Sequence, residues 1–320
     1  MMRSLWTAAS GMLSQQTNLD TIANNLSNIN TVGFKKETTE FKSLLYQTLR
    51  EDSYDSEGEP KAIGIQVGSG VRNSAITAQF TQGSFTATDN PFDIAIEGRG
   101  FFMIQDNNGE TAYTRNGSFQ LSVGVNGLTL TNSQGNPVLS REGNEIVMNP
   151  EWSIEDISIN ENGQVLHARN VVQVYDANDN LMWLEDSNGN IIDEDGNITT
   201  EAANNARANG TDTTRYSLRD VSTFDVMGVL GLAQFNNPAG LKKSGGTFLY
   251  ESDASGEPRI EGVDTGVRFS KTKQGYLEAS NVQAVDEMVN MIVAQRAYEL
   301  NSKIITASDE ILQQANNLRR

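Results

Sequence analysis

The sequence predicts an α+β protein in which two long terminal helices pair as a coiled-coil stalk beside a β-rich middle. Two observations lead to this fold class. Both ends of the 320-residue chain carry apolar residues at helical spacing, whereas the middle carries short apolar runs separated by Asn- and Gly-rich turns. If the two terminal helices pair, they lie side by side. The chain must then leave the stalk after the first helix, form the β-rich middle and return to the stalk for the last helix.

The C-terminal stretch, residues 280–318, predicts one amphipathic helix. It contains no Gly or Pro, and its apolar residues mostly recur every three or four positions. At 1.5 Å per residue such a helix is roughly 58 Å long and needs another long helix to cover its stripe. We expect its seam at Val289, Ile292, Val293, Ala297, Leu300, Ile304 and Ile311, and the last five of these residues are expected to face inward.

The N-terminal stretch, residues 1–34, predicts the partner helix. One row of residues recurs every seven positions at Leu5, Met12, Leu19 and Leu26, and a second row follows at Ala8, Gln15, Ile22 and Ile29. The expected seam residues here are Leu5, Met12, Leu19, Ile22 and Leu26. Gly11 costs the helix about 1 kcal/mol relative to Ala. Because Arg3 and Asp20 are the only charged side chains before Lys35, we expect this helix to sit among copies of itself, the alternative being burial within its own chain.

The next stretch, residues 35–89, is expected as an extended connector. Phe41, Leu44, Leu45, Thr48 and Leu49 keep a helical spacing, and a solvated loop composition follows at residues 51–60. From residue 62 the period changes to that of extended chain with glycine-marked bends.

The remaining middle predicts two β-rich parts. Residues 90–150 and 221–275 form a core domain, a multi-strand meander or barrel-like arrangement, because short strands alternate with turn residues every 8 to 12 positions. Residues 151–220 form an acidic, β-rich insertion. The helical stalk comprises residues 1–34 and 276–320.

Composition excludes several classes of function. The formal net charge of −17 argues against nucleic acid as a partner, since phosphates demand a basic surface. The absence of Cys removes thiolate chemistry, and a single His excludes sites that need two. No run of 18 apolar residues is present, so we expect a protein that is not embedded in a membrane. The first residues make a poor secretory signal peptide, so we expect export without cleavage.

Candidate chemical sites are weak. His167 is expected to be structural or exposed, not catalytic. Residues 186–197 resemble part of a calcium loop, but counting from Asp186 or from Asp193 puts the wrong residues at positions six and twelve, so turn chemistry explains them better. Paired carboxylates of a glycosidase cannot be chosen from the sequence. We therefore expect no enzyme activity, no metal and no cofactor.

Three motifs, in order, carry a resemblance to a known family. The first is Ala23-Asn24-Asn25-Leu26 with Asn28, Thr31, Gly33, Phe34 and Lys35. The second is Gly100-Phe101-Phe102 followed by Tyr113-Thr114-Arg115 and Gly117-Ser118-Phe119. The third is Ser280-Asn281-Val282, Glu287-Met288-Val289, then Gln295, Arg296, Ala297, Tyr298, Glu299 and Asn301. Together they resemble the rod–hook family of bacterial flagellar axial proteins over residues 1–140 and 220–320, and residues 41–50 favour the distal rod within it.

The resemblance implies a structural subunit of the flagellar distal rod. Such a subunit would polymerise helically with itself into a hollow drive shaft that transmits torque from motor to hook across the periplasm. It implies a place in the basal body, as a periplasmic rod reaching the outer membrane. The implied partners are other rod proteins, the hook protein, the P-ring and L-ring proteins and the flagellar type III export apparatus. Signature residues such as Asn24, Asn25 and Asn28 are expected to bond between packed subunits, or else to cap the helix end.

Two alternatives remain open. A hook or proximal rod subunit of the same family would share all three motifs. A secreted protein that binds or hydrolyses peptidoglycan, carried on a helical stalk, belongs to a different class and would have to show that activity in a direct assay.

Overall fold

The computed structural model describes residues 2–50, 65–124, 127–150, 152–175, 181–185, 191–192 and 217–317. The chain forms two compact units. The first, here called the helical unit, contains Met1–Thr86, Phe235–Glu257 and Leu277–Arg320, and therefore both chain ends. The second, the strand unit, contains Ala87–Gln234 and Pro258–Tyr276. Two terminal helices and a strand-rich middle confirm the predicted α+β class. In the described part of the chain, neither helix has a stretch apolar enough to span a membrane.

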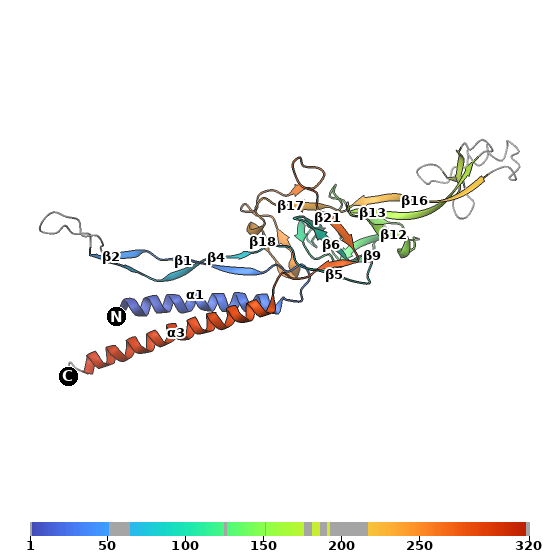
Figure 1. The fold of residues 1–320 in the computed structure, drawn as a ribbon. Coiled ribbons are helices and arrows are strands. Elements are labelled where there is room, and N and C mark those ends of the chain that lie inside the picture. The colour runs from blue at the N-terminus through green and yellow to red at the C-terminus, as the bar shows by residue number, and fades with distance from the viewer. Residues whose placement is uncertain are drawn as a thin grey trace, which may run out of the picture. The chain divides into compact units, whose positions relative to one another are not determined.

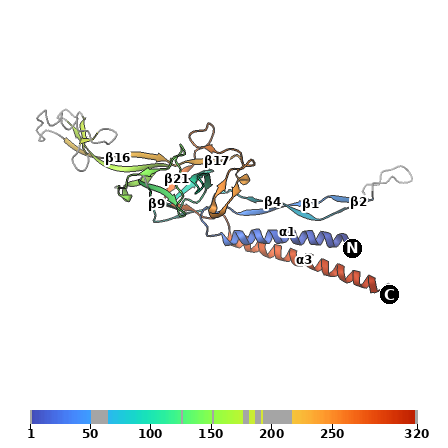
Figure 2. The same cartoon turned by 180° about the vertical axis from the view of Figure 1, so that it is seen from behind.

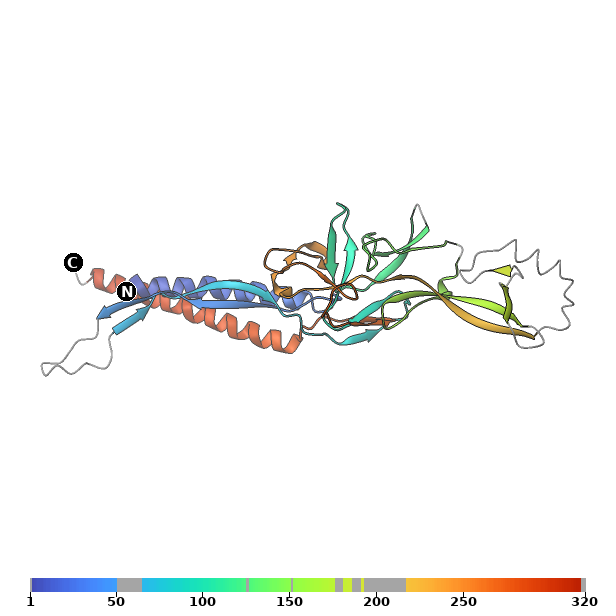
Figure 3. The same ribbon diagram turned by 90° about the horizontal axis from the view of Figure 1, so that it is seen from above.

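The helical unit is built on two long helices, α1 (Met2–Ser27) and α3 (Ala284–Asn317), which pack against each other. They run in opposite directions, since Asn25 near the end of α1 meets Glu287 at the start of α3, while Ser4 meets Ser308, so both chain ends lie at the same end of the pair (Figure 3). Helix α1 ends where Asn28 folds back onto the carbonyl of Asn24 (2.9 Å). The chain then turns at Gly33, whose φ of 71° is accessible to glycine without strain.

A long two-stranded ribbon lies along α1 on the side away from α3 (Figures 1 and 2). Its inner half pairs β1 (Glu37–Ser43) antiparallel with β4 (Val71–Ala78). Its outer half pairs β2 (Tyr46–Arg50) with β3 (Ile65–Gly68). We call these four strands the ribbon. Helix α1 is thus the middle layer of the unit, between the ribbon and α3.

Residues 41–49 form strands of the ribbon and their junction, although the spacing of their apolar residues is helical. Phe41, Leu45 and Leu49 belong to strands or their junction, and all three side chains are exposed. The apolar spacing therefore reflects no buried helical face. Antiparallel partners at residues 65–78 supply the backbone hydrogen bonds that a helix would have supplied, and that long-range pairing is invisible to a local pattern.

Residues 235–257 also belong to the helical unit, although the sequence groups them with the β-rich core. Here β18 (Lys242–Lys243) pairs with β19 (Leu249–Tyr250), flanked by the short 3-10 turns η3 (Pro238–Gly240) and η4 (Gly245–Thr247). Lys243 forms an ion pair with Glu37 at the start of β1, which ties this excursion to the ribbon.

The strand unit contains several small antiparallel sheets, and the described strands do not close into a barrel. Strand β7 (Phe101–Gln105) is central, with β8 (Thr111–Thr114) on one side and β17 (Leu232–Gln234) on the other, and β17 also pairs with β20 (Arg259–Ile260). The longest pair joins β13 (Gln164–Tyr175) to β16 (Ser217–Val229).

The remaining elements of this unit have the following bounds: β6 (Ile94–Glu97), β9 (Phe119–Gly124), β10 (Gly127–Asn132), β11 (Val147–Met148), η1 (Ile154–Asp156), β12 (Ile157–Ile159), β14 (Leu181–Glu185), β15 (Ile191–Ile192) and β21 (Lys271–Gln274). Strands β5 (Phe85–Ala87) and β22 (Tyr276–Glu278) lie where the chain passes between the units.

The central motif of the sequence forms the core of the strand unit. Phe102 and Phe119 are fully buried and meet edge to face, with ring centroids 4.9 Å apart. Arg115 lies over the ring of Phe101 and donates a 2.8 Å hydrogen bond to the carbonyl of Gly98. This motif therefore specifies packing inside the strand unit.

Candidate functional site

The two terminal helices meet through small and polar residues. On α3 the buried side chains are Glu287, Ala294 and Ser308, which lie at multiples of seven residues. On α1 the buried residues facing them include Ala8 and Ile22, also related by multiples of seven. The helices approach closely: a Cβ atom on Gly11 would lie 2.8 Å from Nδ2 of Asn301. Of the two heptad rows in α1, the one through Ala8 and Ile22 is the contact.

The other row of α1 lies at the edge of this contact. Leu5, Met12, Leu19 and Leu26 are half-buried, not enclosed between the helices. The assignment of these residues to contacts between copies stays a prediction.

Most of the apolar residues of α3 that were expected to face inward are not covered by α1 of the same chain. Val293 and Leu300, expected to face inward, are 63% and 60% exposed, and Ile304 and Ile311 are about half exposed. Only Ala297 among the expected inward residues is partly covered. Val285 lies nine positions before the buried Ala294, which is half a turn around the helix. Val285, Val289 and Ile292 therefore lie on the side of α3 away from α1. Ile304 and Ile311, four positions before and three positions after the buried Ser308, flank the covered face and are half-exposed beside it.

We call this exposed face the outer stripe. Its members are Val285, Val289, Ile292, Val293, Leu300, Ile304 and Ile311. A contiguous exposed apolar face of this kind marks an interaction surface.

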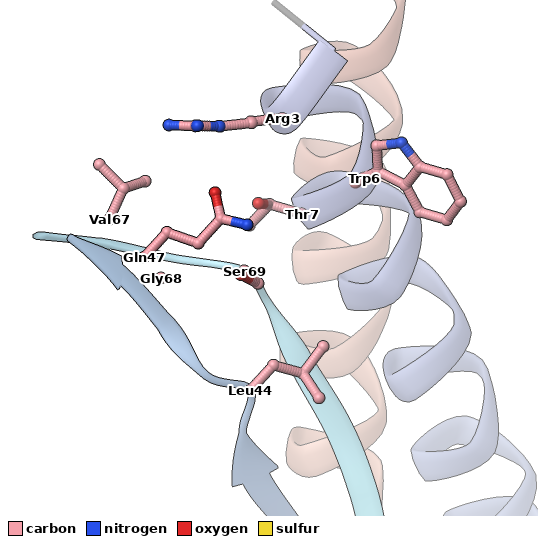
Figure 4. A pocket seen from close by; sticks show the side chains of 8 residues that line it. All are labelled: Arg3, Trp6, Thr7, Leu44, Gln47, Val67, Gly68 and Ser69. Atoms are coloured by element: carbon pink, nitrogen blue, oxygen red, sulfur yellow. The ribbon is translucent and has the colours of Figure 1, made fainter. Parts of the chain in front are cut away.

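A second apolar surface lies on α1, on the side away from α3. Trp6 and Leu13 are 74% and 67% exposed, and no sequence pattern singled out Trp6. With Ala9 they line a groove of about 650 Å³ whose other wall contains Leu44 and Val71 of the ribbon. The groove continues toward the start of α1 as a hollow of about 330 Å³ (Figure 4), where Arg3 and Thr7 stand on the helix side and Gln47 and Val67 on the ribbon side. We call the two hollows together the groove.

A polar junction joins the three layers at the other end of α1. Asn25 is completely buried (0% exposed). Its side chain accepts a hydrogen bond from the backbone N–H of Glu37 and donates one to the carbonyl of Glu37, both at 2.8 Å. It also donates to Oε2 of Glu287 (3.1 Å). One amide group therefore links α1 to the first residue of β1 and to the first turn of α3.

Two ion pairs complete this junction. Lys36 meets the buried Glu287 at 2.5 Å, and the carboxylate lies in the first turn of α3, where the helix dipole favours negative charge. Lys35 meets Glu278 at 2.5 Å with both side chains buried. The backbone N–H of Gly83 donates to the same Glu278 carboxylate (2.8 Å), so the buried charge is both paired and hydrogen-bonded.

The remaining signature residues divide between helix ends and surface. The side chain of Asn28, just beyond the end of α1, donates a hydrogen bond to the side chain of Asn24, and Thr31 donates one to Asn28 (both 3.0 Å). These bonds cap the C-terminal end of α1. Gly33 donates its N–H to the carbonyl of Glu278 (2.8 Å). The others lie as follows: Ala23, Gln295, Arg296 and Tyr298 exposed, and Leu26, Phe34, Ala297 and Asn301 half-buried.

Asn281, in the third motif, resembles Asn25 in that its side-chain amide both accepts a hydrogen bond from the backbone and donates one to it. It accepts from the N–H of Lys36 (2.7 Å) and donates to the carbonyl of Gln79 and to Thr81, each at 2.8 Å. The motif residues nearest the helix ends thus hold the ribbon to both helices.

The structure places one of the two candidate chemical sites. His167 is buried in the strand unit and stacks on Trp152, with ring centroids 4.1 Å apart and planes at 15°. Most of the calcium-like stretch at residues 186–197 lies outside the described residues. Within the described residues, no three His, Asp or Glu side chains are grouped so as to hold a metal ion.

Comparison with known proteins agrees with the three motifs. Residues 5–35 match the family model "Flagella basal body rod protein", residues 95–167 match "Flagellar hook protein FlgE/F/G D1 domain", and residues 273–318 match "Flagellar basal body rod FlgEFG protein C-terminal".

Full-length relatives extend this similarity. The chain is 38% identical to the "Flagellar basal-body rod protein FlgG" of Borreliella burgdorferi, with 100% of both chains covered. It is 35% identical to the FlgG protein of Agrobacterium fabrum, with 97% of both covered. It is 33% identical to that of Bacillus subtilis, again over 100% of both.

Proposed function

The chain belongs to the family of flagellar basal-body rod proteins, and from that premise we propose how it works. It is a structural subunit of the distal rod of the basal body, assembles with other rod and hook components, and belongs to a family of structural proteins and not of enzymes. We propose that it polymerises with copies of itself into an open helical tube. That tube is the hollow shaft that transmits torque from motor to hook across the periplasm.

One observation carries the polymer proposal. The outer stripe of α3 exposes seven large apolar residues, whereas the buried side chains of α3 are Glu287, Ala294 and Ser308. Fully burying side chains of this size stabilises by about 1.5–3 kcal/mol each. A neighbouring copy that covers the stripe would recover part of that energy at every subunit, and repetition along a tube would add stiffness.

The terminal helices are the proposed wall of the tube. We propose that residues 1–34 and 276–320 act together as a coiled-coil stalk, supported by the steps of seven in their buried contact. The seam residues of both helices and the exposed signature residues Gln295 and Arg296 are proposed contacts between copies. Residues 35–89 connect this stalk to the β-rich core of residues 90–150 and 221–275. We propose that the acidic residues 151–220 face outward and discourage lateral association of rods.

Further partners follow from the proposed position. The shaft would pass inside the P-ring and L-ring proteins and meet the hook protein at its outer end. Delivery through the flagellar type III export apparatus, without a cleaved signal peptide, would place the subunit there.

Localisation and motility test the proposal. In a cell whose own gene is deleted, an epitope-tagged chain should restore hooks and swimming, and immunogold labelling of isolated basal bodies should decorate the rod between ring and hook. A variant lacking residues 285–320 should restore neither. Label on the hook alone, or swimming with the truncated chain, would overturn the proposal.

A further inference from the structure

We propose that the groove of one copy receives the outer stripe of α3 from a second copy. This inference rests on the proposed polymer and names the contact that builds it. The groove and the stripe are two different surfaces of the helical unit, so a copy that offers its stripe still has its groove free.

The two surfaces match in chemistry. The groove is lined mainly by apolar atoms of Trp6, Ala9 and Leu13 on α1 and of Leu44 and Val71 on the ribbon. An amphipathic helix laid in an apolar groove anchors through residues at spacings of three, four and seven. The outer stripe supplies that spacing at Val285, Val289 and Ile292, and again at Leu300, Ile304 and Ile311.

The two surfaces face in opposite directions. Leu13 lies nine positions before Ile22, which places it half a turn from the buried face of α1. Val285 has the same relation to the buried face of α3. A contact between unlike surfaces on opposite sides of a subunit is heterologous, and repeated in one direction it makes an open helical filament wherever the rotation between copies does not close a ring.

Charges at the two ends of the groove set the direction and register. On α1, Arg3 lies at one end and Asp20 toward the other, and Arg72 of the ribbon lines the same hollow as Asp20. Arg3 and Asp20 are seventeen positions apart, or about 26 Å along the helix.

On α3, Arg296 and Glu310 are exposed, share the outer side and are fourteen positions apart, about 21 Å. Long Arg side chains can bridge the difference of roughly 5 Å. Arg296 also pairs with Glu299 of its own helix at 2.8 Å, an exposed pair that a neighbour's carboxylate can join.

The antiparallel arrangement makes these charges complementary. When copies share one orientation, the neighbour's α3 runs opposite to α1, as it does within one chain. Arg296 then falls near Asp20, and Glu310 falls near Arg3. In this register Leu13 lies opposite the neighbour's Leu300, and Ala9 lies opposite its Ile304.

Cross-linking tests this register directly, because the natural chain contains no Cys. The full chain carrying Leu13→Cys and Leu300→Cys, expressed in cells lacking the native gene, should give a ladder of disulfide-linked oligomers after mild oxidation of isolated basal bodies. A disulfide requires Cα atoms within about 7 Å. Leu13 lies half a turn from the face of α1 that contacts α3, and a disulfide within one chain would give no ladder. Ala9→Cys with Ile304→Cys is a second pair, should the first disturb assembly.

Three controls define the outcome. Leu13→Cys with Ser302→Cys should give no ladder, because Ser302 lies two positions from Leu300 but about 200° around the helix. Leu13→Cys alone should also give none, and a dimer from it would overturn the inference in favour of a contact between like surfaces. Swimming cells in which neither double variant forms a ladder would overturn the inference and leave the proposed function standing. Absence of the unaltered chain from basal bodies would instead defeat the proposed function.

Charge exchange provides an independent test. Arg3→Glu and Glu310→Arg should each reduce swimming, and the double variant should restore it. The matched double variant Arg3→Glu with Asp309→Arg should not restore swimming, because Asp309 points away from the outer stripe. Equal rescue by both double variants, or no effect of either single change, would contradict the proposed register.

Discussion

At the scale of single residues, Asn25 is the side chain on which the helical unit most depends. It is buried and makes three hydrogen bonds, two of them to the backbone of Glu37 and one to the carboxylate of Glu287. Its neighbour Asn24 has the same chemistry but is exposed. The difference between the two is therefore one of position.

Replacing Asn25 tests this dependence. Asn25→Asp keeps the shape but replaces a donor by an acceptor next to Glu287, so the free energy of unfolding should fall by about 2–4 kcal/mol. Asn24→Asp keeps the acceptor that Asn28 uses and should change stability by less than about 0.5–1 kcal/mol. Urea unfolding followed by helical circular dichroism measures both, and similar losses for the two variants would refute the special role of Asn25.

The surface pair Glu161 and Lys271 carries a pH dependence of known sign. Their side chains are 2.7 Å apart. The hydrogen bond from Lys271, and then its positive charge, lower the pKa of Glu161, while the same contact raises the pKa of Lys271. The contribution of Glu161 to stability is thus present above its ordinary pKa and is lost as the pH falls through the lowered value. That of Lys271 is present below its ordinary pKa and is lost as the pH rises through the raised value.

Removing the positive charge of Lys271 should raise the pKa of Glu161. In Lys271→Met the pKa of Glu161 should rise toward its ordinary value, as measured by NMR titration of the side-chain carboxyl. Because both groups are exposed, salt should diminish the shift in the natural chain as well. A Glu161 pKa that stays equally low in Lys271→Met would mean that another group causes the shift.

At the scale of elements, the two helices owe their close approach to small residues. Gly11 lies under the side chain of Asn301, and Ser4 meets Ser308 at 3.3 Å. Glycine weakens a helix interior by about 1 kcal/mol relative to alanine, so α1 gives up local stability for contact with α3.

A double-variant cycle at Gly11 separates these two effects. Gly11→Ala alone should fail to stabilise, because its Cβ would lie 2.8 Å from Nδ2 of Asn301. In an Asn301→Ala background the same change should recover about 1 kcal/mol of helix propensity. Unfolding free energies of the four chains give the coupling, and an equal gain in both backgrounds would show that the contact does not matter.

At the scale of the whole molecule, net charge opposes assembly. Every copy carries a formal charge of −17, and polymerisation brings these charges together. The contacts proposed to hold the polymer are mainly apolar, with two charge pairs at short range, so salt weakens them less than it weakens the long-range repulsion.

Salt should therefore favour polymerisation of the purified chain. Raising the ionic strength from about 10 mM to about 150 mM shortens the Debye length from roughly 30 Å to roughly 8 Å, and the fraction of protein that sediments as polymer should increase. Sedimentation of the unaltered chain measures it, with a nonassembling outer-stripe variant such as Ile292→Asp as the baseline. A decrease with salt would mean that attraction between opposite charges dominates assembly.

Periodicity and motifs alone are enough to predict the two terminal helices, the strand-rich middle and the family. Periodicity is a local property, and a helix of period 3.6 records its apolar stripe in the chain whatever covers it. The three motifs are likewise local, so they identify the family without any knowledge of contacts.

Which face of each helix is covered depends on contacts between residues that are far apart in the chain. The outer stripe is the most apolar pattern of α3, yet α1 covers the face of Glu287, Ala294 and Ser308 instead. A hydrophobic pattern shows that a face will be buried, but not whether the partner belongs to the same chain or to another. The buried role of Asn25 and the strands at residues 37–50 depended on residues far away in the sequence, and such long-range pairing leaves no local periodicity to read.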